Sequence, residues 1–328
     1  MRKFIIKRLL LSVVIMFFVA LIIYTIMRCM PSSYLETLAR QKASGASGKS
    51  YTEWLEQLKA AYHMDVGILQ GFFAWLSEVA TGNFGESWKW TVLVTDKFKE
   101  VIWDSFTISS ISFVFQLLIA IPLGILAARK QYSKVDYTVT VIALIGISLP
   151  SFFFATILKY VFSIQLGWFP LYGKVGRYHD QLSQFGKFLD IAHHYTLPIV
   201  TLTVVSIGGL MRYTRTNMLE VLNSDFIRTA RAKGISENKV INYHAFRNTL
   251  IPIVTIVGGS LPGLFAGAMI TETLFQVPGI GYTAYQSMIE GDIPFSMFFL
   301  VFMAGLTLLG AIISDILYAV VDPRVRVH

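Results

Sequence analysis

Four places in the chain carry residue types that could do chemistry. Ser47-Gly48-Lys49-Ser50 ends like a phosphate-binding loop, but such a loop needs a glycine where the chain has Ala43, and a strand before it. His179-Asp180 and His193-His194 are candidate metal ligands, although adjacent histidines on a loop do not easily face one ion. Asp315 lies alone near the end of an apolar segment. We therefore expect no catalytic residues, no metal site and no ATP hydrolysis by this chain.

Two other classes of membrane protein would need more ionisable groups than this sequence has. An intramembrane enzyme needs paired carboxylates, a Ser/His pair or metal ligands within its membrane helices. A secondary transporter usually has charges at the midplane or an inverted repeat. The apolar segments here contain almost no ionisable group besides Asp315, and no repeat is evident. Both classes are therefore disfavoured.

The composition indicates an integral membrane protein. Of the 328 residues 54% are hydrophobic and 15% are charged, whereas a soluble domain carries about 25% charged residues. The single cysteine, Cys29, excludes a disulfide framework and a Cys-rich metal site. The net charge is +8 without a basic patch interleaved with aromatic residues, so we expect no nucleic-acid partner. The basic residues instead orient the chain in membrane lipid.

Six apolar segments predict an all-α protein with six transmembrane helices. The first has the basic-then-apolar layout of a signal peptide, but at about 19 residues it is long enough to span a bilayer. Arg28-Cys29-Met30-Pro31 is also a poor cleavage site, so we expect an uncleaved span. The predicted spans are Leu9–Met27, Trp103–Ala128, Tyr137–Ile164, Tyr195–Met211, Ile251–Phe275 and Phe295–Val321.

These spans divide the chain into three parts. Residues 1–30 form the N-terminal cytoplasmic end and the first span, residues 31–102 an extracytoplasmic segment, and residues 103–328 a five-span core with the cytoplasmic loop 212–250. The excess of Lys and Arg in residues 129–136 and 212–250 places both termini in the cytoplasm. Two apolar packing faces at helical spacing are expected in residues 31–102: Trp54, Leu55, Leu58, Ala61 and Tyr62 form one, and Phe72, Phe73, Trp75 and Leu76 form the other. On the fifth span, a packing face of small residues is expected from Gly258, Gly259, Gly263 and Gly267.

The polar stretch from Asn223 to Pro252 predicts two short helices between long apolar segments. Asn223, Ser224 and Asp225 offer N-cap side chains, and Gly234 suits the left-handed residue that ends a helix. Ser236 then caps a second helix that carries Val240, Ile241, Ala245 and Phe246. Pro252 is expected in the first turn of the next membrane helix. By composition alone, this stretch is equally well an ordinary basic cytoplasmic loop that happens to be helical.

The order of residues in this stretch resembles the EAA loop of ABC-importer permeases. The run from Asp225 to Gly234, followed by His244, Arg247-Asn248 and Pro252, resembles the oligopeptide/dipeptide branch and its B-type permease. In that family the loop holds a coupling helix that lies in a groove of the ATPase subunit. The residues that the resemblance assigns to this coupling role are Asp225, Arg228, Thr229, Ala230, Arg231, Ala232, Lys233 and Gly234.

Other parts of the chain extend the resemblance to nearly its whole length. They are the element from Tyr62 to Asp65, the turn Gly82-Asn83-Phe84-Gly85-Glu86-Ser87, the stretch from Glu272 to Gly281 and the closing Val321-Asp322-Pro323-Arg324. His63, Asn83 and Thr91 depart from the family pattern, and the usual Gly-Asp-Pro after the first span is missing. Glu272 either faces the pathway or, as we expect, reaches the outer membrane interface.

The resemblance implies a permease subunit of an ATP-driven peptide importer in a prokaryotic cell membrane. The implied partners are a second homologous permease, two ABC ATPase subunits that bind ATP and Mg²⁺, and an extracytoplasmic peptide-binding protein. No cofactor is expected on this chain. The implied mechanism is alternating access driven by closure of the ATPase pair. Nickel and glutathione remain alternative substrates, and the long segment 31–102 favours peptides.

Overall fold

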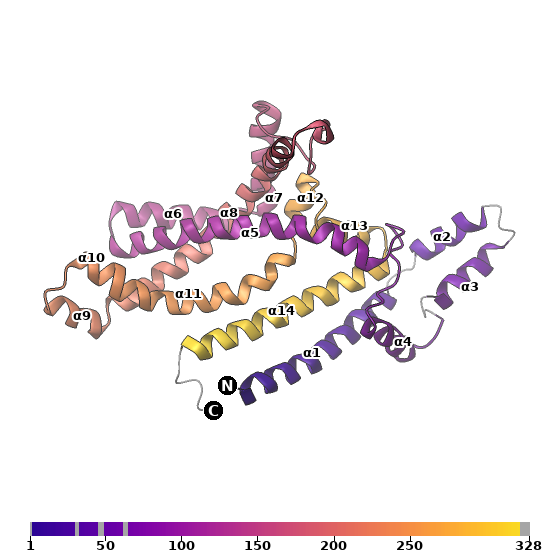
Figure 1. The fold of residues 1–328 in the computed structure, drawn as a ribbon, viewed down its shortest axis with the longest axis horizontal. Helices are drawn as coiled ribbons and strands as arrows, with labels where there is room; N and C mark the ends of the chain where they lie inside the picture. Colours follow the sequence, from indigo (N-terminus) through magenta and orange to yellow (C-terminus); the bar gives the residue numbers. More distant parts are fainter. Residues whose placement is uncertain (1, 30–32, 45–48, 62–64, 322–328) are drawn as a thin grey trace. The chain divides into compact units, whose positions relative to one another are not determined.

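The computed structural model describes residues 2–29, 33–44, 49–61 and 65–321 (Figure 1). Predictions that concern Ser47, Gly48, Tyr62, His63 and residues 322–324 lie outside these ranges. Every regular element in the described ranges is helical, and the one β-bridge joins Glu86 to Leu93. The prediction of an all-α membrane protein is confirmed.

In the described part of the chain, four helices are long and apolar enough to cross a membrane. They are α1 (Arg2–Cys29), α5 (Val94–Arg129), α8 (Gln184–Leu222) and α14 (Ile293–Val321). Two bent helix pairs raise the number of spans to as many as 6. The helices α1, α5 and α8 extend beyond the predicted apolar limits because polar residues at their ends continue the helical hydrogen bonding outside the apolar segment.

The third predicted span, Tyr137–Ile164, is not one continuous helix. It consists of α6 (Lys134–Ser148), followed after Leu149 and Pro150 by α7 (Ser151–Leu158) and the π-helical turn η1 (Lys159–Gln165). The two halves meet at an angle of 100°. Pro150 disfavours the α-conformation at the residue before it, and Leu149 accordingly has an extended ψ of 121°. The break therefore lies at Pro150.

The fifth predicted span, Ile251–Phe275, is also interrupted. It comprises α11 (Phe246–Ser260), the 3₁₀ turn η4 (Leu261–Phe265) and α12 (Met269–Phe275). Gly267, with φ of 76°, lies in the break before α12. The expectation that Pro252 lies in the first turn is wrong, because the π-helical turn η3 (Val240–Ala245) runs directly into α11 and places Pro252 inside it.

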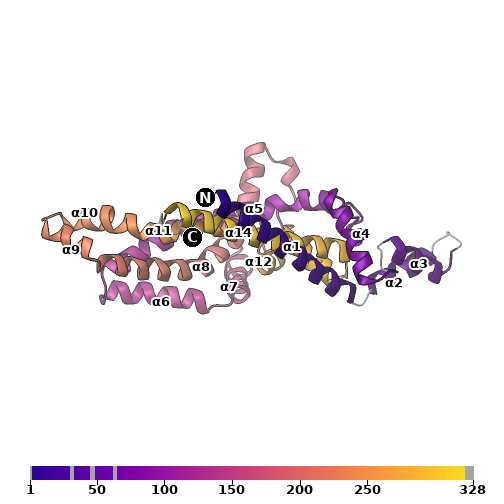
Figure 2. The same cartoon turned by 90° about the horizontal axis from the view of Figure 1, so that it is seen from below.

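The described chain forms two compact units. One comprises Asp104–Tyr282 with residues 309–321, and the other comprises Arg2–Trp103 with Thr283–Leu308. In the first unit α5, α6, α8 and α11 pack side by side (Figures 1 and 2). Glycines permit this close packing. A Cβ on Gly208 of α8 would overlap the Ala143 carbonyl of α6, and one on Gly124 of α5 would overlap Thr214 of α8.

The small-residue face predicted on the fifth span is confirmed at two of its four positions. A Cβ at Gly258 would overlap Leu317, and one at Gly259 would press on Ser314, so these glycines let α11 approach α14. A Cβ at Gly263 would meet nothing within 4 Å. Gly267 serves the backbone break described above, where its positive φ favours glycine.

The second unit packs α1, α2 (Ser33–Ala43), α3 (Tyr51–Ala61), α4 (Ile68–Ala80) and the start of α14 around one apolar cluster. Phe72 is fully buried there, while Trp54 and Trp75 are partly buried against it, as their helical spacing predicts. Phe73, which the prediction placed on the same face, is 57% exposed, so the prediction is wrong at this position. The buried members of the cluster are Ala20, Tyr24, Met27, Leu35, Ala39, Leu58, Phe72, Trp88, Ile293 and Met297.

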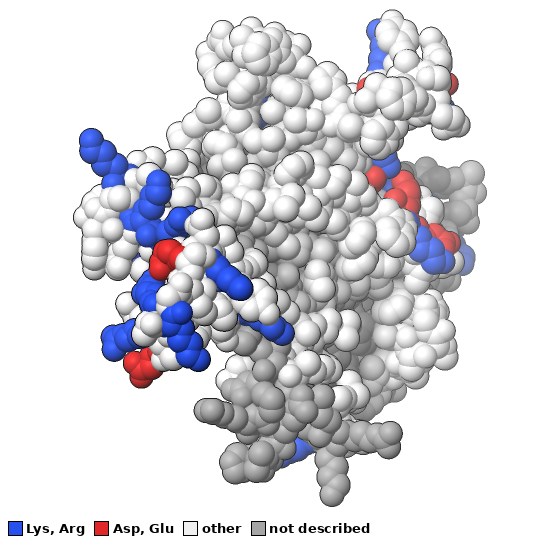
Figure 3. Space-filling view, turned by 60° about the vertical axis from the view of Figure 1, so that its left-hand side comes forward, with Lys and Arg blue, Asp and Glu red and all other residues white. Residues whose placement is uncertain are grey.

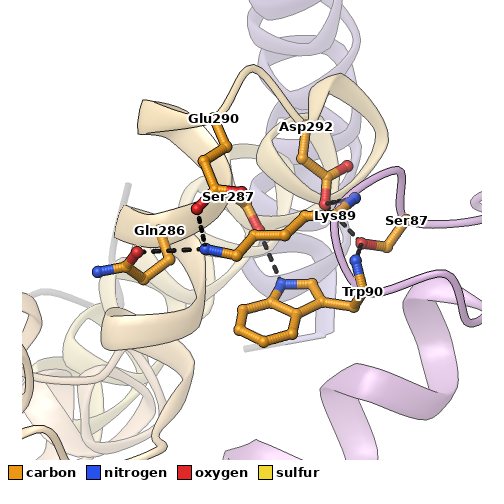
Figure 4. Close-up of polar contacts among 7 residues, drawn as sticks. All are labelled: Ser87, Lys89, Trp90, Gln286, Ser287, Glu290 and Asp292. Carbon is orange, nitrogen blue, oxygen red and sulfur yellow. Dashed lines mark hydrogen bonds and ion pairs between the residues drawn. The ribbon is translucent and has the colours of Figure 1, made fainter. Parts of the chain in front are cut away.

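A buried carboxylate fastens the turn before α5 to the start of α14 (Figure 4). The Asp292 carboxylate accepts hydrogen bonds from Ser87 Oγ at 2.5 Å, from the Trp88 amide at 3.1 Å and from the Phe295 amide at 3.3 Å. Burial raises the pKa of the Asp292 carboxyl above its usual value, while the donors around it act in the opposite direction. The turn is therefore held by interactions distant in sequence.

Neighbouring side chains of the same turn contact α13 (Ile280–Ile289) and the residues that follow it (Figure 4). Lys89 Nζ lies 2.7 Å from Glu290 Oε1 and 3.2 Å from Gln286 Oε1. Trp90 Nε1 donates to Ser287 Oγ at 3.1 Å. These contacts, together with those of Asp292, are the polar core of the second unit.

Candidate functional site

The predicted coupling helix is α9 (Asp225–Ala232), a two-turn amphipathic helix of the first unit. Ile227 and Ala230 are buried, three residues apart on one face. The side chains on its other faces are exposed: those of Asp225, Phe226, Arg228, Thr229, Arg231 and Ala232. The helix therefore has one face fixed to the protein and a larger surface free for a partner.

The floor under α9 is an apolar cluster built from three other elements. Ala128 comes from the end of α5, Met218 from α8, and Val240 with Ile241 from η3. Ile227 and Val240 are completely buried in this cluster. α9 therefore packs directly on the ends of α5 and α8, two of the candidate membrane spans.

The beginning of α9 differs from the predicted cap. Ser224 occupies the N-cap position, but its Oγ donates to the Val221 carbonyl at 2.6 Å and makes no capping bond. Asn223 belongs to the end of α8 as its C-cap. The sequence did not indicate that Asn223 ends α8, because the predicted fourth span stopped well before Leu222. In the structure α8 continues to Leu222, which leaves only a two-residue link before α9.

The end of α9 has the geometry that the sequence predicts. Gly234 has φ of 74°. Its amide donates to the Arg231 carbonyl at 2.9 Å, and the Ile235 amide donates to the Ala230 carbonyl at 3.3 Å. These two bonds form the Schellman motif, which satisfies carbonyls left free by the last helical turn. The chain then reverses into α10 (Glu237–Lys239) and η3.

The second predicted helix is present but irregular. Ser236 is its N-cap residue without a side-chain capping bond, and the helix passes through the π-helical turn η3 before continuing as α11. Val240, Ile241 and Ala245 are buried, as their spacing predicts. The π-helical turn is a further departure from the regular helix expected here.

The three basic residues assigned to the coupling role have different surroundings. Arg231 donates to both carboxylate oxygens of Glu237, at 3.1 and 2.8 Å, so part of its charge is satisfied within the chain. Arg228 lies 3.5 Å from Asp225 in an exposed pair, which is weak in water. Lys233 is exposed at the C-cap. Arg228 and Lys233 therefore carry the charge most readily available to an acidic partner.

Exposed basic side chains gather around this end of the first unit (Figure 3). Arg129 Nη2 donates to Asn238 Oδ1 at 3.0 Å, which ties the end of α5 to α10. This contact confirms that segments 129–136 and 212–250 lie at the same end of the protein. The exposed Lys and Arg residues here are Arg129, Lys130, Lys134, Arg212, Arg228, Arg231, Lys233, Lys239 and Arg247.

The histidines considered as metal ligands make hydrogen bonds within the protein. His179 Nδ1 lies 2.6 Å from Asp190 Oδ2, and His194 Nδ1 lies 2.8 Å from the Asp190 carbonyl. His193 Nε2 lies 2.7 Å from the Trp168 carbonyl. Among the residues that the structure describes, no group of three or more His, Cys, Asp and Glu side chains could hold a metal ion.

Lys49 and Ser50, the last residues of the stretch considered as a phosphate-binding loop, have a local structural role. Ser50 Oγ accepts from the Glu53 amide at 3.3 Å, and Glu53 Oε2 accepts from the Ser50 amide at 2.7 Å. This reciprocal pair is a capping box at the beginning of α3. Lys49 Nζ bonds Gln57 Oε1 at 3.1 Å.

Glu272 is a structural carboxylate, so the expectation that it reaches the membrane interface is wrong. Its side chain is almost fully buried and accepts from Ser105 Oγ at 2.7 Å and from the amides of Ala268 and Tyr282, both at 2.9 Å. A Cβ at Gly279 would press on this carboxylate. The glycine-rich turn therefore brings backbone donors onto Glu272, an arrangement that its sequence position alone does not indicate.

Phe226 is a candidate that the sequence analysis missed. Its side chain is 48% exposed on α9, between the buried Ile227 and the exposed Asp225. A large apolar residue one position away from the buried face of a polar helix is the feature that could have identified it. An exposed aromatic side chain is a favourable anchor for a partner protein.

The fold and this surface define a helical, multi-pass membrane protein that carries a short amphipathic helix with an exposed polar face. Residues 120–327 match the family described as "Binding-protein-dependent transport system inner membrane component". The chain belongs to this family. It is a permease subunit of an ABC importer, a transport component rather than an enzyme, and it works with ATPase and other subunits.

Individual relatives match over nearly the whole chain. The chain is 35% identical to the "Oligopeptide transport system permease protein AppB" of Bacillus subtilis, covering 99% of this chain and 100% of that protein. It is 33% identical to "Oligopeptide transport system permease protein OppB" of Salmonella typhimurium, again covering 99% and 100%. It is 32% identical to "Di/tripeptide transport system permease protein DppB" of Pseudomonas aeruginosa, covering 99% of each.

A solved structure supports the fold. The inward-facing MetNI methionine ABC transporter aligns with a TM-score of 0.54 at 18% identity, covering 69% of this chain and 96% of the matched chain. At this identity the similarity concerns the arrangement of helices.

Proposed function

We propose that this chain is the permease subunit of an ATP-driven peptide importer and forms half of its translocation pathway. The relatives named for oligopeptide and di/tripeptide transport, aligned from end to end, support the substrate class. The partners are a second homologous permease, two ATPase subunits that carry ATP and Mg²⁺, and an extracytoplasmic peptide-binding protein. Both termini lie in the cytoplasm.

Within this function, α9 docks on an ATPase subunit. The observation that carries this role is the division of α9 into a buried face, Ile227 and Ala230, and an exposed face with Phe226, Arg228 and Thr229. The buried face rests on the ends of two membrane helices, so closure of the ATPase pair is passed mechanically to the pathway. Ala230 packs within the chain, and Ala232 and Lys233 lie on the side offered to the partner.

Uptake by cells tests the substrate class. Cells that lack their own peptide importers are supplied with this permease and the partner genes encoded beside it, and are given labelled tripeptide, labelled glutathione or ⁶³Ni²⁺. We expect tripeptide accumulation that requires an intact ATPase and that unlabelled peptide inhibits. If the cells accumulate nickel or glutathione but no peptide, the proposed substrate class is wrong. The assignment of the chain to the permease family would not be affected.

A further inference from the structure

A cavity of about 370 Å³ lies between α6 and α8 in the first unit. One part of its wall is apolar and another part carries two guanidinium groups and two hydroxyl groups. From α6 the lining residues are Val139, Thr140, Ala143 and Leu144, and from α8 they are Met211, Arg212, Arg215 and Thr216. A cavity with this division suits an amphipathic molecule.

The cationic part of the cavity is only partly neutralised. Arg215 donates from Nε and Nη2 to the two carboxylate oxygens of Asp136, at 2.6 and 2.8 Å. The Asp136 side chain is 4% exposed, so this bidentate pair holds the Arg215 side chain firmly. Arg212 is exposed, and its guanidinium makes no hydrogen bond or ion pair with the residues that the structure describes. The net charge facing the cavity is therefore positive.

An apolar strip continues from the cavity along the outside of α6. Tyr137, Val141, Leu144 and Ile145 are 62%, 52%, 46% and 53% exposed and share one helical face. Leu144 also lines the cavity, so the strip and the cavity are contiguous. The strip has the width of a helix face and offers a path for a hydrocarbon chain.

The cavity lies towards the polar beginning of α6, the end at which lipid headgroups are expected. Its arginines lie near the polar beginning of α6, where Ser133 accepts from the Asp136 amide and caps the helix. Towards the other end of α6, the exposed side chains Val141, Leu144 and Ile145 are all apolar. Basic pockets between membrane helices at this level suit anionic lipid headgroups.

We propose that this cavity binds an anionic phospholipid. The phosphate contacts Arg212 and the free edge of Arg215, the glycerol region lies against Thr140 and Thr216, and an acyl chain follows Val141, Leu144 and Ile145. Charge complementarity selects the lipid, because the uncompensated arginine favours a headgroup with net negative charge over a zwitterionic one. The inference requires only that the chain spans a membrane and is independent of the transported substrate.

Native mass spectrometry of the purified, complete importer tests this site. The complex is titrated in detergent with phosphatidylglycerol or with phosphatidylcholine, and the lipids retained per complex are counted. The unmodified complex should retain phosphatidylglycerol preferentially. In the Arg212→Gln variant that retention should fall about fivefold, the effect of removing one lysine or arginine near an anionic lipid surface. Equal retention by the variant and the unmodified complex would overturn the proposal.

Two further variants separate the lipid site from its alternatives. Lys130→Gln removes an exposed cation from the same end of the unit but outside the cavity, and should retain phosphatidylglycerol normally. Leu144→Trp fills the apolar part, leaves both arginines in place and should abolish retention.

If inorganic phosphate displaces the lipid and Leu144→Trp has no effect, the site binds a free anion. If either cavity variant instead releases the second permease subunit, this face is a subunit contact; both results reject the proposal.

Discussion

Gly234 and Phe226 represent two kinds of residue in the stretch that we propose as the coupling loop: Gly234 fixes its backbone, and Phe226 is exposed on α9. Gly234 was recognisable in the sequence because a helix that ends at a glycine uses its left-handed conformation. Phe226 was not, because exposure of an aromatic side chain depends on which neighbours bury Ile227. Such neighbours come from α5, α8 and η3, far apart in sequence.

Substitutions on the exposed face of α9 test the proposed role of individual residues. Arg228→Glu and Phe226→Ala should leave the permease inserted and folded, since neither side chain belongs to the buried cluster. Each should lower co-purification of the ATPase and its stimulation by loaded binding protein, by about tenfold for an anchor that contributes 1–2 kcal/mol to the interface. The measurement is ATPase activity of the complex in nanodiscs.

Lys239→Glu is the matched control, because it reverses an exposed charge on α10, outside the coupling residues. It should retain full attachment and stimulation. If the α9 variants also behave like the unmodified complex, α9 is only a basic loop. The variant Gly234→Trp separately tests the backbone conformation at the end of α9. A Cβ there meets no neighbour within 4 Å, so its cost of roughly 1–2 kcal/mol arises from the positive φ alone.

Among the elements, the helices were predictable from hydropathy and the breaks were not. An apolar run of about 20 residues requires a helix in lipid because no water satisfies its backbone. The position of a proline does not by itself determine where such a helix ends. Pro122 and Pro198 lie inside continuous helices, whereas Pro150 separates α6 from α7. The difference depends on whether neighbouring helices support the interrupted hydrogen bonds, and the sequence does not contain that information locally.

The contact between α6 and α8 gives the prediction at the scale of elements. Gly208→Ala places a methyl group against the Ala143 backbone and should destabilise the permease by about 1–3 kcal/mol. The adjacent Gly209→Ala adds the same methyl group where nothing lies within 4 Å, and should be neutral or stabilise by up to about 1 kcal/mol. Thermal unfolding in detergent compares the two, and equal stability would show that α6 and α8 do not approach this closely.

The molecule as a whole was assigned to its class by composition, and the distribution of charge predicts its orientation. Burial of Asp292 and Glu272 could not be foreseen, because their partners are supplied by turns distant in sequence. The coupling residues could be placed on a helix from the sequence, but the roles of the individual side chains needed the packing of the first unit.

Accessibility to a membrane-impermeant maleimide tests the proposed orientation. Thr52 and Ser236 are both exposed, on α3 and before α10. In a Cys29→Ala background, Thr52→Cys should be labelled in intact cells and Ser236→Cys only after the membrane is permeabilised. Labelling of both positions from outside would be incompatible with the proposed topology.

The Asp292 anchor also constrains how the protein is made. Its bond to Ser87 joins residues 205 positions apart, so this attachment of the turn cannot form until Asp292, directly before α14, has been synthesised. At about 5–20 residues per second of synthesis, this contact becomes possible only some tens of seconds after Ser87 has been made. Until then Ser87 lacks its carboxylate partner, and the turn is completed late in the synthesis of the chain.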